Sequence, residues 1–203
     1  MSGRELRDRR RERNAQTRRQ ILDAAWELVR ESGLASLSMR DLGERVGMRA
    51  QSLYVYFPSK HAMFDAMYAE GHQQAHDMHA AVAEADDPTE TLRRHARAYV
   101  RFATDDPVRY QLLYQRTIPG FEPSAESYEI AVRSLDYVRR CLRACGITGQ
   151  RAVDAFTAVT GGIAAQQNAN EPAGKRWLRL TDDITDMYLA HYLPEAGTGT
   201  GST

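Results

Sequence analysis

The sequence predicts an all-α fold with about nine helices, on the strength of three observations. No segment keeps the alternation of apolar and polar residues that a half-buried strand needs, and no β-hairpin turn signature is present. Apolar residues recur instead at every third or fourth position, which is the spacing of a helix face. Gly, Pro and Asp-Pro breaks separate these periodic segments. With 203 residues and 42% hydrophobic content, the chain has the composition of a globular protein.

The first two predicted helices are placed by their ends. Thr17 is a suitable N-cap and Gly33 a suitable C-terminal residue, so the first helix is expected over residues 17–32. Ser38, followed three residues later by an Asp, resembles a capping box, and Gly47 ends the second helix. The apolar residues of each helix share one stripe, formed by Ile21, Ala25, Leu28 and Val29 in the first and by Met39, Leu42 and Val46 in the second.

The third predicted helix lies within residues 49–56 of the stretch "GMRAQSLYVYFPSK". A helix of about two turns is marginal in water, so its two neighbours must support it, as in a helix-turn-helix. Leu53 and Phe57 are four residues apart and are expected to pack inward. Tyr54 and Tyr56 are expected to turn their hydroxyl groups outward.

Six further helices are placed by caps and breakers. Ser59 is a suitable N-cap, and "DDPTE" at 86–90 and "DDP" at 105–107 each begin another helix. Two prolines mark residues 117–124 as a loop. The expected ranges are 59 to the low 80s, about 87–103, 107–116, 125–145, 149–169 and 174–193.

The net charge of zero conceals an asymmetry. Residues 1–60 contain 13 Lys and Arg against 8 Asp and Glu, whereas residues 61–203 contain 14 against 19. This basic N-terminus favours an anionic partner, and nucleic acid suits it better than a membrane because the segment has almost no large apolar residues to insert. We expect residues 1–16 to form a disordered basic arm. We hypothesise that Arg9, Arg10, Arg11 and Arg13 in this arm add nonspecific affinity for phosphates.

Residues 17–68 resemble the DNA-binding domain of the tetracycline-repressor (TetR) family. The resemblance rests on ordered motifs, namely "ILDAA" in the first helix, the corner at Gly33, "LSMRDL", the "VGM" turn and "LYVYFPSK". It implies a homodimeric, ligand-responsive transcriptional repressor, which binds a palindromic operator and releases it when a small molecule enters the C-terminal domain. The implied division is 17–63 for DNA binding and 64–193 for ligand binding and dimerisation, with 194–203 as a flexible tail.

The resemblance also assigns DNA contacts by position. Arg commonly reads guanine, Gln suits adenine, and Ala can touch the thymine methyl group. The implied base-reading residues are Arg40, Arg49, Ala50 and Gln51, and the implied phosphate-contacting residues are Thr17, Ser38, Ser52, Tyr54, Tyr56 and Lys60. Arg40 has a rival role as the ion-pair partner of Glu44. Gly43 departs from the family pattern, in which Ala is usual, and costs roughly 1 kcal/mol of helix propensity.

Beyond residue 68 the resemblance is weaker and indicates fold more than ligand. By analogy, a pocket for a mostly apolar ligand lies among residues 88–170. Its candidate residues are Tyr99, Phe102, Tyr110, Leu113, Tyr114, Phe121, Tyr137, Phe156, Gln166 and Gln167. The last two helices are the expected dimer interface, with Ala158, Gly161, Gly162, Ala165, Trp177, Leu180, Ile184, Met187 and Tyr188 as candidates. Ordinary packing within the chain is the alternative for both sets.

Two other functions stay open from the sequence. His72, His76 and His79 share a helix face and could bind zinc or nickel in a metal-sensing regulator, although an ordinary polar face has the same spacing. A helical small-molecule-binding protein without DNA function is the other alternative. No nucleotide-binding glycine loop or nucleophile elbow is present, so we expect neither an enzyme nor a cofactor. No apolar run reaches the roughly 18 residues of a membrane span, and the charged N-terminus is no signal peptide, which predicts a cytoplasmic protein without a membrane partner.

Overall fold

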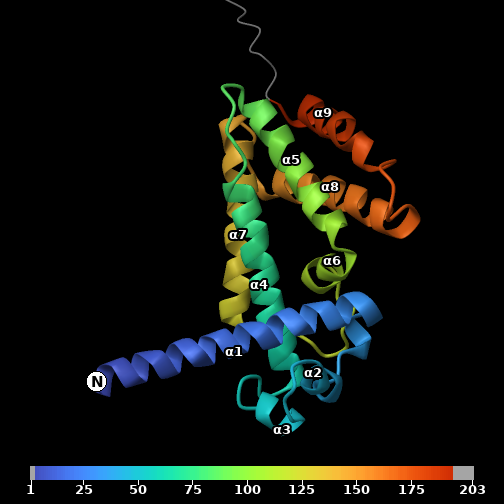
Figure 1. Ribbon diagram of the computed structural model, residues 1–203. Coiled ribbons are helices and arrows are strands. Elements are labelled where there is room, and N and C mark those ends of the chain that lie inside the picture. Colours follow the sequence, from blue (N-terminus) through green and yellow to red (C-terminus); the bar gives the residue numbers. More distant parts are fainter. Residues whose placement is uncertain (1–2, 194–203) are drawn as a thin grey trace, which may run out of the picture. The chain divides into compact units, whose positions relative to one another are not determined.

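The computed structural model describes residues 3–193, which are helical apart from short connections (Figure 1). Within this range there are nine α-helices, two short 3-10 helices and no strand, which confirms the predicted all-α fold. The predicted tail at 194–203 and the first two residues of the predicted arm lie outside the described residues. The elements are α1 (Gly3–Ser32), η1 (Leu34–Ser36), α2 (Met39–Arg45), α3 (Ala50–Leu53), α4 (Lys60–Ala80), α5 (Pro88–Asp105), α6 (Pro107–Tyr114), α7 (Ala125–Ala144), α8 (Gln150–Asn170), η2 (Leu178–Leu180) and α9 (Thr181–Tyr192).

The largest difference from the prediction is the start of α1. Residues 3–16, expected to be disordered, continue the helix without a break. The segment after Gly3 is rich in Arg, Glu and Gln, which are good helix formers, and contains no further Gly or Pro before Gly33. Thr17 is consequently an interior residue rather than an N-cap, and its hydroxyl group donates a hydrogen bond to the Arg13 carbonyl at 3.0 Å.

Two other helices are shorter than predicted. The α3 helix covers only Ala50–Leu53, because the chain then turns, with the N–H groups of Tyr56 and Phe57 both bonded to the Leu53 carbonyl. The α9 helix begins at Thr181 instead of near residue 174. Ahead of it, the backbone N–H groups of Trp177 and Leu178 bond to the side-chain oxygen of Gln167 rather than to helical carbonyls.

The chain packs as two compact units. The first comprises Met1–Gly71 and Gln111–Tyr128, and the second comprises His72–Tyr110 and Glu129–Thr203. The prediction placed one boundary at residue 63, whereas the packing assigns residues 64–71 and 111–128 to the first unit. Local contacts explain this difference, because the loop after α6 is attached to the first turns of α4, as described below.

The core of the first unit joins α1, α2, the turn after α3 and α4. Its fully buried side chains are Ile21, Ala25, Val29, Leu42, Leu53, Phe57, Met63, Phe64 and Met67. Polar bonds connect the helices around this core. The Trp26 indole N–H donates to Glu70 at 2.7 Å, and the Arg45 guanidinium pairs with both carboxylate oxygens of Glu31.

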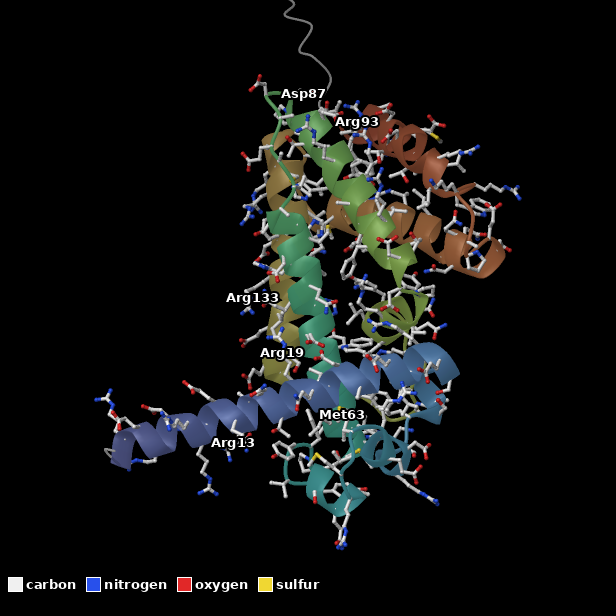
Figure 2. All side chains as sticks on the ribbon, in the orientation of Figure 1. Arg13, Arg19, Met63, Asp87, Arg93 and Arg133 are labelled. Carbon is white, nitrogen blue, oxygen red and sulfur yellow. The ribbon has the colours of Figure 1, made fainter. Side chains whose placement is uncertain are left out.

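In the second unit α5, α8 and α9 pack against one another (Figure 1). Their buried side chains include Leu92, Ala96, Phe156 and Leu189. Asp87, at the start of α5, caps the helix by accepting a bond from the Thr89 N–H (Figure 2). None of the described helices is long and apolar enough to cross a membrane.

Candidate nucleic-acid interface and ligand cavity

The turn between α2 and α3 explains the unusual glycine in α2. Ser38 caps α2 as predicted, with its Oγ accepting a bond from the Asp41 N–H at 3.1 Å. At the other end, the Met48 N–H donates to the Gly43 carbonyl at 2.8 Å. A Cβ atom on Gly43 would lie 2.6 Å from the Met48 carbonyl oxygen and 3.3 Å from the Ala50 nitrogen. Glycine therefore lets the start of α3 approach α2 more closely than alanine would.

The short α3 segment has one buried and one exposed side. Leu53 and Phe57 are fully buried, which confirms that they pack inward. Tyr54 is 46% exposed and Val55 79% exposed, while Tyr56 is half-buried. Four residues of helix cannot be stable by themselves, so the segment depends on these two buried anchors.

The four candidate base-reading residues lie at the surface of α2 and the start of α3. Arg49 and Gln51 are exposed and Ala50 is half-buried. The Arg40 side chain is 83% exposed, and its Nε atom lies 3.2 Å from Glu44. A pair this exposed contributes little to stability, about 0.3–0.5 kcal/mol for this spacing on a helix, so Arg40 is not needed for the fold.

The candidate phosphate-contacting residues differ in the donors that they present. Ser52 and Tyr54 are exposed, and Ser38 is half-buried. Lys60 donates to the Ala35 carbonyl at 3.2 Å, and its ammonium lies 5.5 Å from the centre of the Phe64 ring, but an ammonium has three N–H donors. The single proton of the Thr17 hydroxyl is used within α1, so this arrangement does not present it to a phosphate.

Arg18 is a residue of this interface that the sequence interpretation missed. Its guanidinium donates to the Tyr56 carbonyl at 2.7 Å and lies 4.2 Å from the centre of the Phe57 ring. It thus joins α1 to the turn after α3. The spacing in the sequence could have predicted this contact. Arg18 precedes Ile21 by three residues and Ala25 by seven, and it therefore lies on the same face of the helix as these two buried residues.

The first unit contains a cavity of about 400 Å³. Three of the ten candidate pocket residues line it, Leu113, Tyr114 and Phe121. The sequence interpretation did not include its other walls, Tyr68, Leu112, Gln115, Arg116, Ile118, Glu122, Pro123 and Tyr128. Burial raises the pKa of the Tyr68 phenol, and nearby Tyr128 and Asp65 raise it further, so this hydroxyl stays protonated.

One wall of the cavity is attached directly to α4. The Phe121 ring packs against three residues on one face of α4, with ring centroids 6.2 Å from His61, 5.9 Å from Phe64 and 6.3 Å from Tyr68. The Asp65 carboxylate accepts bonds from the backbone N–H of Ser124 at 2.7 Å and from the hydroxyl groups of Ser124 and Ser127 at 2.9 and 3.0 Å. The loop before α7 is therefore fixed to the part of α4 that follows the helix-turn-helix.

The other seven pocket candidates lie in the second unit, and none of them lines this cavity. Gln167 is fully buried and accepts the bonds from Trp177 and Leu178 already described. Phe156 packs in the core against Tyr188, with ring centroids 5.2 Å apart. The remaining candidates also contact neighbours within this unit. Tyr99 and Tyr110 pack with Ala103 and Ala164, and the Phe102 ring is covered by the Arg109 guanidinium. The Tyr137 ring stacks on His79, and the exposed side chain of Gln166 accepts a hydrogen bond from Asn170.

The dimer candidates separate into outer and inner residues. Ala158 and Gly162 on α8 are exposed, as is Met187 on α9, which is 71% exposed. Gly161, Ala165, Trp177, Leu180 and Ile184 are half-buried. The prediction that Tyr188 lies at the dimer interface is wrong. Tyr188 is only 5% exposed, and its hydroxyl donates to the Ala152 carbonyl at 2.9 Å. Burial raises the pKa of Tyr188 to about 12. It belongs to the core of its own chain and not to an outer face.

The histidine face of α4 is mainly a packing surface. His72 and His79 are buried, and the Nδ1 atoms of His79 and His95 lie 3.0 Å apart, so one ring donates and the other accepts. Burial, followed by the charges of His95 and His76, lowers the pKa of His79 to about 3. Within residues 3–193, no group of three or more His, Cys, Asp or Glu side chains is placed to bind a metal ion. The face formed by His72, His76 and His79, on which the metal-sensing alternative depends, is therefore not such a group.

Comparison with known proteins gives two family matches in separate parts of the chain. Residues 21–67 match the bacterial regulatory proteins of the tetR family, and residues 92–166 match the tetracycline-repressor-like C-terminal domain. The HTH-type transcriptional repressor Rv1353c of Mycobacterium tuberculosis is 28% identical over 151 residues, which are 74% of this chain and 56% of that protein. This chain thus spans little more than half the length of that relative.

A second relative and a solved structure agree with these matches. The class A tetracycline repressor from transposon 1721 of Escherichia coli is 28% identical over 162 residues, covering 77% of this chain and 69% of that protein. The crystal structure of the regulatory protein SCO4313 superposes with a TM-score of 0.76 at 22% identity, covering 89% of this chain and 98% of that one. At this identity the superposition shows a shared fold.

Proposed function

Because the chain belongs to the tetR family of bacterial helix-turn-helix regulators, we propose that it represses transcription as a homodimer on a palindromic operator and is released by a small molecule. One observation carries the DNA-binding part of this proposal. The α3 segment is anchored by Leu53 and Phe57, while Arg49, Gln51 and Tyr54 stay exposed beside it. Both relatives described above are named repressors, which supports repression over activation.

A second copy of the chain follows from the size of α3. Four helical residues can read only a few base pairs, and two such segments about 34–36 Å apart would double the sequence that is recognised. The outer face of α8 suits a contact between copies, because a Cβ atom on Gly162 would meet nothing within 4 Å and another helix could approach there. The exposed thioether of Met187 on α9 offers apolar area to the same kind of contact.

The cavity of the first unit is the proposed ligand site. Its volume of about 400 Å³ lies within the range of small-molecule pockets, roughly 300–1,000 Å³. Tyr68, Tyr114, Tyr128 and Phe121 provide aromatic surface, and Arg116, Gln115 and Glu122 provide a few polar groups. The lining therefore favours a mostly apolar, aromatic molecule that is oriented by one or two polar contacts.

Phe121 supplies a route from this ligand to the DNA-binding segment within one unit. A ligand that changes the packing of Phe121 acts directly on His61 and Phe64 in the first turns of α4. Phe64 is fully buried in the same unit as Phe57, and the Lys60 ammonium donates a hydrogen bond to the Ala35 carbonyl, in the chain before α2. A ligand with different affinities for two placements of these turns would therefore shift the position of α2 and α3.

Selection of bound sequences from a random pool of duplex DNA tests this function. We expect a palindromic consensus, with a complex that weakens as salt rises because phosphate contacts release counterions. A consensus without two-fold symmetry would contradict the homodimer. If the protein forms no specific, salt-sensitive complex with any duplex, the proposed function is contradicted. That result would favour the alternative of a helical small-molecule-binding protein without DNA function.

A further inference from the structure

The first half of α1 has no role in the core of its unit. Every described side chain from Arg4 to Gln16 is exposed. In Figure 1 this part of α1 extends beyond α2 and α3, and in Figure 2 its side chains, with Arg13 labelled among them, project into the surroundings. Fourteen helical residues span about 20 Å at 1.5 Å per residue, which is the length of roughly six base pairs.

The helical conformation sorts the charges of this segment by face. Arg7, Arg10, Arg11 and Arg18, together with Asn14 and Ala15, line a shallow groove of about 430 Å³, which we term the arginine groove. At 3.6 residues per turn, the acidic residues Glu5, Asp8 and Glu12 fall on a different side of the helix. Arg9 and Arg13 fall nearly opposite Arg7 and Arg11. A disordered arm would not separate these arginines, so the sorting is a property of the folded helix.

Arg18 fixes the direction in which the arginine groove faces. Its bond to the Tyr56 carbonyl and its contact with the Phe57 ring place this side of α1 toward the turn after α3. Tyr54 and Tyr56 in that turn are the proposed phosphate-contacting tyrosines. The groove thus continues, along α1, the edge of the surface that is proposed to follow the DNA backbone.

We propose that the arginine groove binds backbone phosphates of duplex DNA flanking each operator half-site. This inference rests on the proposed function and extends it, because the contact lies outside the bases that α3 can read and adds affinity independently of sequence. Arginine forms bidentate bonds with phosphate oxygens, which suits a groove lined by guanidinium groups. The described residues that line the groove include no large apolar side chain, which disfavours insertion into a lipid surface.

Two double variants with the same change of charge test the inference. R7Q/R11Q removes two arginines of the groove, and R9Q/R13Q removes two arginines from the opposite face at the same spacing, so helicity and net charge are matched. The affinity of full-length protein for its selected operator is measured against salt concentration. Two probes are compared, one ending at the operator and one extended by about eight base pairs on each side.

For R7Q/R11Q we expect about tenfold or greater weakening on the extended probe, a salt slope lower by about one for each lost contact, and little change on the short probe. R9Q/R13Q should bind both probes like the unmodified protein, because the helix turns Arg9 and Arg13 away from the arginine groove. This expectation replaces the hypothesis, made for a disordered arm, that these two arginines also add affinity for phosphates. Equal weakening by both variants would overturn the inference, since it would indicate diffuse charge rather than a folded groove. The inference would also be overturned if R7Q/R11Q bound DNA as tightly as the unmodified protein. This holds equally if the variant bound DNA normally but lost binding to anionic phosphatidylglycerol vesicles, since the groove would then bind lipid. If the unmodified protein binds no duplex specifically, the proposed function itself has failed.

Discussion

Similar side chains have different roles in the two units. In the first unit Gln51 and Tyr54 are exposed beside a very short helix, and the fold does not need their polar groups. In the second unit Gln167 and Tyr188 are buried between long helices and hydrogen-bonded to backbone groups. An amide or a phenol therefore indicates binding only when the local packing leaves it unused. A residue type at helical spacing does not distinguish the two cases.

The largest expected effect concerns the anchors of α3. Leu53→Ala removes a fully buried side chain and should lower the free energy of unfolding by about 2–5 kcal/mol, with loss of operator binding. Chemical denaturation and a gel-shift assay measure both effects. Val55→Ala is the matched control, because Val55 is 79% exposed and its truncation should change stability by less than about 0.5 kcal/mol. Equal costs for the two variants would contradict the division into a buried and an exposed side.

Two glutamine variants compare the units directly. Gln167→Ala leaves the backbone N–H groups of Trp177 and Leu178 without their acceptor and should cost about 1–3 kcal/mol of stability. Gln51→Ala should change the free energy of unfolding by less than about 0.5 kcal/mol but weaken binding to the selected operator. The same two assays measure both variants. The reverse pattern, a destabilising Gln51→Ala and a neutral Gln167→Ala, would refute the comparison.

Gly43→Ala sets helix propensity against close packing within α2. Helix propensity alone predicts stabilisation of about 1 kcal/mol, but the added Cβ atom would meet the Met48 carbonyl at 2.6 Å. We expect the clash to prevail and stability to fall by about 1–3 kcal/mol, together with DNA affinity. Thermal unfolding decides between the two effects. A stabilised variant would show that the turn can move without cost.

The smallest expected effect is a pH dependence located in the second unit. Because burial lowers the pKa of His79 to about 3, below its value near 6.5 in the unfolded chain, the unfolded state takes up a proton first as the pH falls. The stability that neutral His79 contributes is therefore present above its unfolded pKa and is lost progressively as the pH falls from near 6.5 toward 3. Between pH 7 and 6 this residue should lower the free energy of unfolding by about 0.7 kcal/mol. Denaturation at both pH values should show a smaller loss for His79→Asn. His191→Asn, at an exposed histidine, should retain the full dependence.

The parts of the fold that were predictable from the sequence are those set by neighbouring residues. Ser38, Gly47 and Ser59 act within one turn of their own helix, and the structure has helix ends beside all three. The arm at 3–16 was not predicted, because its high charge resembles that of a disordered segment although its residues favour helix. The family resemblance identified the α2–α3 surface, and the burial of Leu53 and Phe57 agrees with it.

The cavity was predictable only in part. Leu113, Tyr114 and Phe121 were identified, but Tyr68 comes from a helix more than forty residues earlier in the chain. Periodicity reports which face of a helix is buried, and it does not report what that face contacts. Arg18 and Tyr56 illustrate the same limit, since their contact joins residues 38 positions apart.

The position of Trp26 has a practical consequence. The chain contains two tryptophans, Trp26 in the first unit and Trp177 in the second. Trp26 is buried and bonded to Glu70, so its fluorescence should change when α1 separates from α4. With Trp177→Phe, the remaining emission becomes an intrinsic optical reporter of the first unit alone. Titrations with candidate ligands could then be followed in the first unit without attaching a dye.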